Sequence, residues 1–238
     1  FESSYAKNTV KHLREIIEVF VDAGILSHGI VSLQSMDAAT LAAVHRSNIR
    51  LDKYEELATT FRRQKLPLFV DLMVGLPGQT PASFRDDLQQ CIDREVQVRI
   101  PITELLANSP MNAPEYREEH RIVTDARPGD LTRPPLVIST ATFTRAEYDG
   151  MRDLRLVFLL AEDFGALRQF SRYVRAETWL REIDLYERMR CEVADDPDER
   201  ARLVFGEAAV EAIIDADGIH ATGARRGDTA DTSPGAER

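Results

Sequence analysis

Three apolar runs of the sequence each lead into a short segment whose side chains could do chemistry. Gln34 and Ser35 follow the run GIVSL, a Gly-Leu-Pro-Gly loop at 75–78 follows LFVDLMV, and residues 101–109 follow VQVRI. An amide and a hydroxyl can hydrogen-bond a polar ligand, and a glycine loop lets bare backbone approach one. Arg46, after the next predicted helix, could return to this edge as a fork for a carboxylate. These segments predict a binding site for a polar small molecule.

A structural explanation competes with each of these functional ones. Gln34 and Ser35 could simply close a turn, and Arg46 could be a solvated arginine that suits the end of a helix. The glycine loop could be only a tight strand-to-helix connection. The chain has two cysteines and five histidines, and their spacing matches no metal site, so we predict no metal ligands here. Cys91 falls on an apolar helix face, which indicates packing.

The elements that must position these segments alternate through the first hundred residues. Apolar residues at helical spacing predict helices from Val10 to Val21 and at 38–44, 52–65 and 81–92, with Thr9, Asp37 and Thr80 as N-caps. Apolar runs at 29–33, 68–74 and 96–102 predict buried parallel strands. Alternating βα units indicate an α/β fold with a parallel sheet or barrel. Three strands cannot close a barrel, so we expect a partial (β/α) barrel with further strands upstream.

The second half of the chain reads as mostly helical. It begins with a polar, proline-rich stretch that contains a short helix at 115–120, and PLVIST predicts an extra strand. Thr144 is expected to cap one long helix whose core stripe is Leu156, Leu160, Phe164, Leu167, Phe170 and Val174. Phe158 and Met111 are also expected in the core. Two more helical stretches are predicted, around Trp179, Ile183 and Tyr186, and around Leu203, Ala208 and Ile213.

The composition of the chain limits the kinds of partner that it is expected to bind. The chain carries 30 Lys and Arg against 40 Asp and Glu, a net charge of −10, so it lacks the basic footprint of a duplex nucleic-acid binder. The longest apolar run, 156–161, is far shorter than a membrane span. Few cysteines and no secretory leader fit a reducing cytoplasm. We therefore expect a small-molecule substrate, no nucleic acid and no membrane partner.

The chain opens on Phe1 in the middle of a pattern, because FESSYAKN reads as the end of a strand and its following loop. We expect a piece of a longer protein, whose upstream half is then a partner of these residues. A mature chain trimmed by proteolysis is the alternative.

Several of these segments together resemble one enzyme superfamily. SLQSMDAATLAAVHRSN and VDLMVGLPGQTPASF resemble radical-SAM enzymes, which use S-adenosylmethionine (SAM). YAKN, LANSPMNAPEYREEH and VISTAT make the chain most similar to the C-terminal part of cobalamin-binding radical-SAM proteins, over residues 1–175. The resemblance implies an enzyme that cleaves SAM to a 5′-deoxyadenosyl radical, with cobalamin-dependent methyl transfer in the full-length protein.

The same resemblance implies a SAM site at the strand ends. Gln34, Ser35 and Arg46 would contact the methionine part of SAM. The adenine would lie against Met73, Gly75 and Leu76, with the strand ending at Ile102 on the other side. Lys7 and Asn8, in a loop at the mouth, are weaker candidates. The family also needs a CxxxCxxC loop for its 4Fe-4S cluster, and neither Cys91 nor Cys191 supplies it. We expect the cluster and cobalamin ligands elsewhere in the full-length protein, and no activity from this chain alone.

The expected organisation has three parts. Residues 1–125 would form the C-terminal half of the radical-SAM barrel, residues 126–218 an extra strand and a helical region, and residues 219–238 a disordered tail. Two other functions stay open: a cobalamin-independent radical-SAM enzyme, and a catalytically inert accessory or truncated chain. The upstream sequence would separate them.

Overall fold

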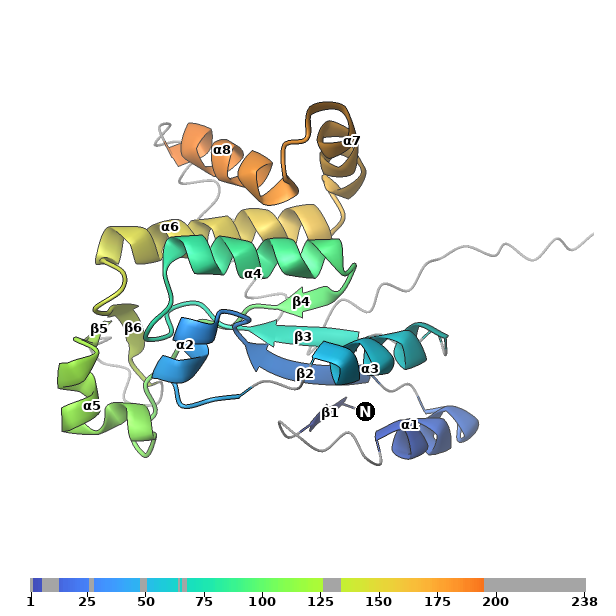
Figure 1. Cartoon of the computed structure of the whole chain (residues 1–238), viewed down its shortest axis with the longest axis horizontal. Helices are drawn as coiled ribbons and strands as arrows, with labels where there is room; N and C mark the ends of the chain where they lie inside the picture. Colours follow the sequence, from blue (N-terminus) through green and yellow to red (C-terminus); the bar gives the residue numbers. More distant parts are fainter. Residues whose placement is uncertain are drawn as a thin grey trace, which may run out of the picture.

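A parallel sheet organises the computed structural model of this chain, which describes residues 2–5, 13–25, 28–47, 51–63, 65, 68–125 and 134–194. Its strands are β1 (Glu2–Tyr5), β2 (His28–Gln34), β3 (Leu68–Leu72) and β4 (Gln97–Arg99), and they neighbour one another in that order (Figure 1). The prediction of an α/β fold with a parallel sheet is confirmed. Within the described residues this sheet is open and does not close into a barrel.

The helices of the first half are α1 (Leu13–Asp22), α2 (Ala38–Ala43), α3 (Leu51–Arg63), α4 (Pro81–Asp93) and α5 (Pro114–Glu119), with a 3-10 turn, η1 (Pro110–Asn112), before α5. Those of the second half are α6 (Arg145–Phe158), α7 (Arg168–Thr178) and α8 (Glu182–Ala194), with a π-helical turn, η2 (Leu159–Asp163), after α6. A second, antiparallel sheet pairs β5 (Val123–Asp125) with β6 (Leu136–Ser139). Because β5 ends at residue 125 and β6 begins at residue 136, this sheet lies across the domain boundary that the sequence predicts. No described helix is both long and apolar enough to cross a membrane.

Side-chain caps start three helices where the sequence predicts them. Asp37 accepts from the backbone N–H of Thr40, at 2.7 Å, at the start of α2. Thr80 and Thr144 form capping boxes at the starts of α4 and α6. Each cap satisfies a backbone N–H that the first helical turn leaves without a partner. The predicted helix over Leu203, Ala208 and Ile213, the tail at 219–238, and Lys7, Asn8 and Thr9 lie outside the described residues.

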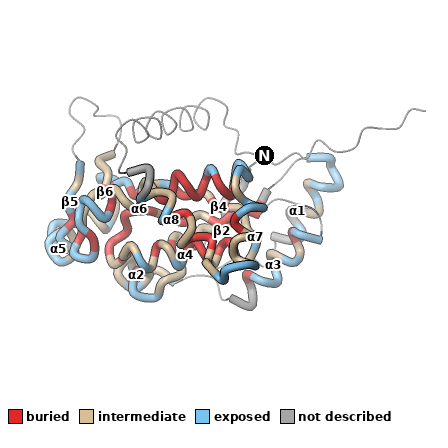
Figure 2. Tube along the Cα trace, turned by 90° about the horizontal axis from the view of Figure 1, so that it is seen from above, coloured by how far each residue is buried: buried red, intermediate tan, exposed pale blue. Residues whose placement is uncertain are grey.

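The core lies between the sheet and the helices α3, α4 and α6. Val31, Val70 and Val98 stand in register on β2, β3 and β4 and are buried together on one face of the sheet. They belong to a hydrophobic cluster that includes Phe61 of α3 and Leu88 of α4. Figure 1 shows α4 and α6 side by side along this layer with α8 outside them, and Figure 2 shows the buried residues concentrated there. Cys91 is buried among them, as its helix face predicts.

The prediction of one long helix after Thr144 is wrong. The α-helix ends at Phe158, η2 inserts a wider turn, and Gly165 adopts a left-handed conformation (φ 71°) before α7 begins. A π-helical turn changes the angular register of the residues that follow it, so the expected stripe does not continue onto one face. Arg168 then reaches back to the carbonyl oxygen of Glu162.

The exposure of the stripe follows from this break. Phe158 is buried as expected, but Leu160, Phe164 and Phe170 are exposed, so their assignment to the core is wrong. Trp179 is not part of the next helix. It ends α7 in a left-handed conformation and is 89% exposed. Ile183 and Tyr186, around which the sequence predicts a helix, lie on α8 and are buried, as is Glu182.

The packing of β2 against α3 gives a test of the fold. A Cβ on Gly29 would lie 2.5 Å from ring atoms of the buried Phe61, so Gly29→Ala should lower the free energy of unfolding by about 1–3 kcal/mol, the usual cost of overpacking a core. Urea unfolding followed by circular dichroism measures this change.

Gly150→Ala, on α6, is the matched control, because its added methyl group would meet only Arg190 of α8, at ordinary contact distances, and alanine improves helix propensity. Shortening the ring with Phe61→Leu in the same chain should make Gly29→Ala less harmful. Equal stability of the parent and Gly29→Ala proteins would contradict the close contact between β2 and α3.

Candidate functional site

The three segments singled out in the sequence meet at the carboxyl edge of the parallel sheet. The backbone N–H of Met73 donates to the carbonyl of Gln34 at 2.8 Å, which joins the ends of β2 and β3. The N–H of Val74 donates to the carbonyl of Pro101 at 3.1 Å, and that of Thr103 donates to the carbonyl of Val74 at 2.8 Å. The end of β3 is thereby joined to the segment after β4. This edge is where parallel α/β folds place ligands.

Gln34 closes β2 in an unusual conformation. Its φ is 66°, in the left-handed region that non-glycine residues seldom adopt, and the pairing of β2 with β3 shifts register between Ser32 and Gln34. Such local strain persists only where the surrounding structure enforces it, and it is common at binding sites. Gln34 is half-buried, and its side chain makes no hydrogen bond within the described part of the chain.

Ser35 faces the interior. Its side chain is fully buried, and its hydroxyl donates to Oδ2 of Asp87 on α4 at 2.7 Å. The second carboxylate oxygen of Asp87 accepts from the backbone N–H of Met36 at 2.8 Å. Burial raises the pKa of Asp87 to about 6, although the hydrogen bonds from Ser35 and Met36 act in the opposite direction. Asp87, buried on α4, therefore holds the loop after β2 in place from the interior of the protein.

Gln79 does the same for the glycine loop after β3. Its side chain is fully buried, with Nε2 donating to the carbonyl of Met73 and Oε1 accepting from the N–H of Gly75, both at 2.9 Å. One amide thus satisfies two backbone groups that lie beyond the regular strand pairing.

The two glycines of this loop are required by packing within the chain. Gly75 has a φ of 91°, and a Cβ on it would lie 3.1 Å from the carbonyl oxygen of Val137 on β6. Gly78 has a φ of 83°, and its Cβ would lie 2.7 Å from that of Ala43 on α2. The loop is therefore held between α2 and β6. Close approach of a ligand is not needed to explain either glycine.

Arg46 returns to the sheet as the sequence predicts. Its Nη2 donates to the carbonyl of Ser32 at 3.3 Å, at the register shift of β2. Its Nε is buried and has no hydrogen-bond partner in the described structure. Burial lowers the pKa of Arg46. A buried guanidinium nitrogen without an acceptor is costly, so an anionic or polar ligand at this edge would be favoured.

A row of polar residues on one sheet face escaped prediction from the sequence. Ser32, Asp71 and Arg99 stand in register on β2, β3 and β4. Ser32 donates to Oδ2 of Asp71 at 2.9 Å, and Nε of Arg99 donates to Oδ1 of Asp71 at 2.8 Å. The signal was present, because each is a polar residue in a largely apolar strand. Only the register places the three side by side.

The six predicted SAM contacts thus gather at one edge but differ in exposure. Gln34, Arg46 and Met73 are half-buried, so their side chains reach the surface of this edge. Ser35, Gly75 and Leu76 are buried and support it. Their contact with SAM stays a prediction. Asp87 and Gln79, which hold the two loops, were not predicted as site residues.

Within the described residues no group of three His, Cys, Asp or Glu side chains could hold a metal ion. Cys91 is buried in α4 and Cys191 is exposed on α8. These residues do not fit an iron–sulfur cluster.

The fold is α/β, with the candidate site at the carboxyl edge of its parallel sheet, and sequence comparison adds specific relatives. The cobalamin-dependent radical SAM methyltransferase TokK of Streptomyces tokunonensis is 31% identical over 133 residues, which cover 55% of this chain and 20% of TokK. The 2-(S-pantetheinyl)-carbapenam-3-carboxylate methyltransferase of Streptantibioticus cattleyicolor is 32% identical over 114 residues, 47% of this chain and 17% of that enzyme. No protein-family model matches the chain.

Among solved structures, the radical SAM methyltransferase TsrM of Kitasatospora setae, with cobalamin and a 4Fe-4S cluster bound, matches with a TM-score of 0.42 and 16% identity. The match covers 62% of this chain and 30% of TsrM. A TsrM structure with tryptophan and a SAM analogue matches with a TM-score of 0.40.

The chain is distantly similar to cobalamin-dependent radical SAM methyltransferases over about half of its length. It spans about a fifth or less of the length of the two curated relatives.

The buried carboxyl of Asp87 gives a test of this site. Because its pKa is raised from 3.8 to about 6, the folded chain binds a proton that the unfolded chain has already lost between these values. The stability contributed by this group is complete below pH 3.8 and is lost as the pH rises through 6. At about 1.4 kcal/mol per pKa unit the loss is about 3 kcal/mol. Asp87→Asn should remove this slope.

Urea unfolding of the parent and Asp87→Asn chains at pH 4, 5, 6 and 7 measures the effect. Relative to the parent, the variant should gain stability as the pH rises. Glu177→Gln removes a carboxylate from the exposed side of α7 and controls for the change in charge. Parallel pH profiles for the parent and Asp87→Asn proteins would contradict the raised pKa of Asp87.

Proposed function

We propose that this chain is part of a cobalamin-dependent radical SAM methyltransferase and supplies one side of its SAM site. The sequence similarity to TokK carries the proposal, because it spans about half of this chain at 31% identity. In this proposal the four parallel strands are a segment of a (β/α) barrel, whose reactive groups lie at the carboxyl ends of the strands. The predicted SAM residues lie at that edge.

The half-buried side chains would make the contacts. SAM carries a carboxylate, an ammonium group and a ribose, and Arg46 and Gln34 offer a guanidinium and an amide to such groups. The buried Nε of Arg46, which has no acceptor within the described residues, favours this assignment over a purely structural one. Met73, at the end of β3, offers an apolar surface to the adenine.

The buried residues would keep the contacts in place. Asp87 holds Ser35 and Met36, and so sets the conformation of Gln34 before them. Gln79 holds Gly75 and Met73. A binding site whose side chains are already ordered loses less conformational entropy when its ligand binds.

Bound at this edge, SAM would supply the methyl group and the radical of the proposed chemistry. The residues described here fit SAM but do not fit the iron–sulfur cluster, so cluster and cobalamin binding are assigned to other parts of the full-length protein.

Equilibrium binding of SAM to the full-length, cluster-loaded protein tests the proposal. Loss of a hydrogen bond to a charged group costs about 1.5–3 kcal/mol, so Arg46→Ala should weaken SAM binding by roughly tenfold to a hundredfold. Gln34→Ala should weaken it less, because a neutral amide is lost. Iron content should stay unchanged in both variants.

Arg63→Ala is the matched control, since Arg63 is an exposed arginine on α3. It should bind SAM as tightly as the parent. Unchanged affinity in Arg46→Ala would remove Arg46 from the site, whereas failure of the loaded parent protein to bind SAM would overturn the proposed function.

A further inference from the structure

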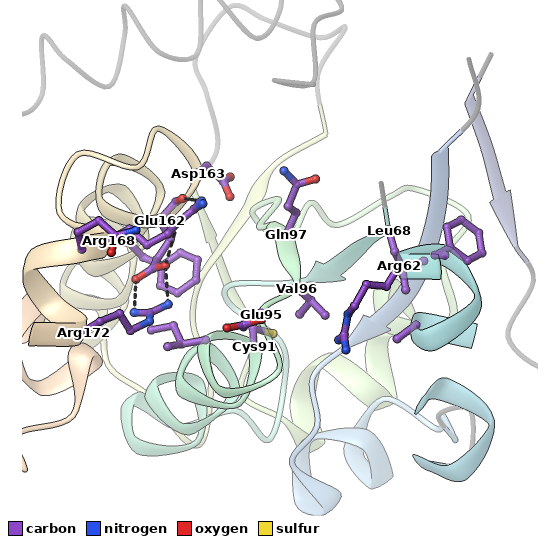
Figure 3. Close-up of a pocket in the computed structure, with 15 residues that line it drawn as sticks. Arg62, Leu68, Cys91, Glu95, Val96, Gln97, Glu162, Asp163, Arg168 and Arg172 are labelled. Carbon is purple, nitrogen blue, oxygen red and sulfur yellow. Dashed lines mark hydrogen bonds and ion pairs between the residues drawn. The ribbon is translucent and has the colours of Figure 1, made fainter. Parts of the chain in front are cut away.

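A pocket of about 480 Å³ opens at the opposite, amino edge of the sheet. Its walls come from α3, from the end of α4 and from η2 with the start of α7 (Figure 3). Leu68 and Gln97, the first residues of β3 and β4, line it. The proposed SAM edge lies at the other ends of these strands, so the two places are separate.

Apolar side chains form the floor. Phe61, Leu68, Ile92 and Phe158 line the pocket and are buried. Pockets of about 300–1,000 Å³ with an apolar floor and a few polar groups are typical of small-molecule sites. The size suits a compact ligand, and the half-buried Ala58 and Val96 offer it an apolar surface within a lining that is mostly polar.

Some charged groups of the wall already satisfy one another. Both carboxylate oxygens of Glu162 accept from Arg172 at 3.0 Å, and the hydroxyl of Tyr186 donates to Glu162 at 2.5 Å. Arg172 also lies 3.4 Å from Glu182. Because these side chains already pair with one another and join η2, α7 and α8, they are poor candidates for ligand contact.

Some other polar side chains of the wall form no such ion pairs within the described residues. Asp163 accepts a hydrogen bond from the backbone of Val98, and Glu95 and Gln97 lie on the same pocket. No ion pair of Asp163 or Glu95 is present within the described residues. Burial raises the pKa of Asp163 to about 7, with Arg168 acting to lower it and Glu162 to raise it. Two acids that form no ion pair in the described part of the chain therefore face one cavity.

We propose that this pocket binds a small organic cation, a protonated amine on an apolar arm. The ammonium group would lie between Asp163 and Glu95, with the amide of Gln97 as a further acceptor. The apolar arm would cover Ala58 and Val96, the half-buried apolar residues of the lining. Arg62, exposed on the opposite wall, has no side-chain partner in the described structure and would repel such a ligand weakly.

Ligand binding should depend on pH through Asp163. The charged groups that face it are Glu162 on its own turn, Arg168 and Arg172 on α7, Glu95 at the end of α4 and Arg62 on α3. A cation favours the ionised carboxylate. With a pKa of about 7, the ionised fraction of Asp163 rises about tenfold between pH 6 and pH 8, and affinity should rise by about the same factor.

Isothermal titration of the whole chain with 2-phenylethylamine tests the proposal, with 2-phenylethanol as the neutral ligand of the same shape. The amine should bind at pH 8 and about tenfold more weakly at pH 6, and the alcohol should bind weakly at both. Equal binding of amine and alcohol, or amine binding that does not change with pH, would overturn the proposal.

Two variants act in opposite directions. Asp163→Asn should weaken amine binding at pH 8 and remove its pH dependence, while Glu177→Gln, an equal charge change on the exposed side of α7, should leave both unchanged. Arg62→Gln removes an exposed cation from the rim and should strengthen amine binding by a few fold. This variant keeps the test valid if Asp163→Asn fails to fold, and weaker or unchanged binding in Arg62→Gln would contradict the proposed site.

Discussion

Backbone groups at the carboxyl ends of the parallel strands must find hydrogen-bond partners where the regular pairing stops, and two buried side chains provide them. Gln79 bridges Met73 and Gly75, and Asp87 accepts from Met36 and Ser35. An unsatisfied backbone group in the interior costs about as much as a lost hydrogen bond. The loops after β2 and β3 therefore keep one conformation, and the edge that carries the proposed SAM contacts depends on these two residues.

The residues proposed to contact a ligand therefore differ from the residues that hold them in place. Gln34 and Arg46 offer polar atoms at the surface of the edge, whereas Ser35 and Gly75 are used by packing below it. The glycine loop has a structural cause in its contacts with α2 and β6. A sequence motif of this kind therefore combines residues that face a ligand with residues that hold them, and exposure is what distinguishes the two.

The two edges of the sheet have different chemistry. The carboxyl edge combines a guanidinium with an amide, which suits an anionic or polar ligand such as SAM. The amino edge combines an apolar floor with Asp163 and Glu95, two acids that form no ion pair within the described residues, and this suits a cation. The polar row of Ser32, Asp71 and Arg99 crosses the sheet between these edges. The strands thus give one scaffold two chemically distinct ends.

Local sequence signals determined much of this fold. The apolar runs placed β2, β3 and β4, the caps Asp37, Thr80 and Thr144 placed three helix starts, and the strand ends indicated the candidate edge. Each depends on neighbouring residues alone. The signals failed after Phe158, where apolar spacing continued through a helix that the structure breaks at η2 and Gly165.

Contacts between residues far apart in the sequence were decided by the tertiary structure, because spacing along the chain does not predict them. Asp87 meets Ser35 across 52 positions, and Asp71 meets Arg99 across 28, because strand register and helix packing bring them together. The pocket at the amino edge also joins α3, α4 and η2, which are distant in sequence. The sequence by itself indicated the carboxyl edge of the sheet and its candidate residues Gln34, Ser35 and Arg46. Only the packing decided which of them lie at the surface of that edge and which lie beneath it, because burial and pairing depend on neighbours from other elements.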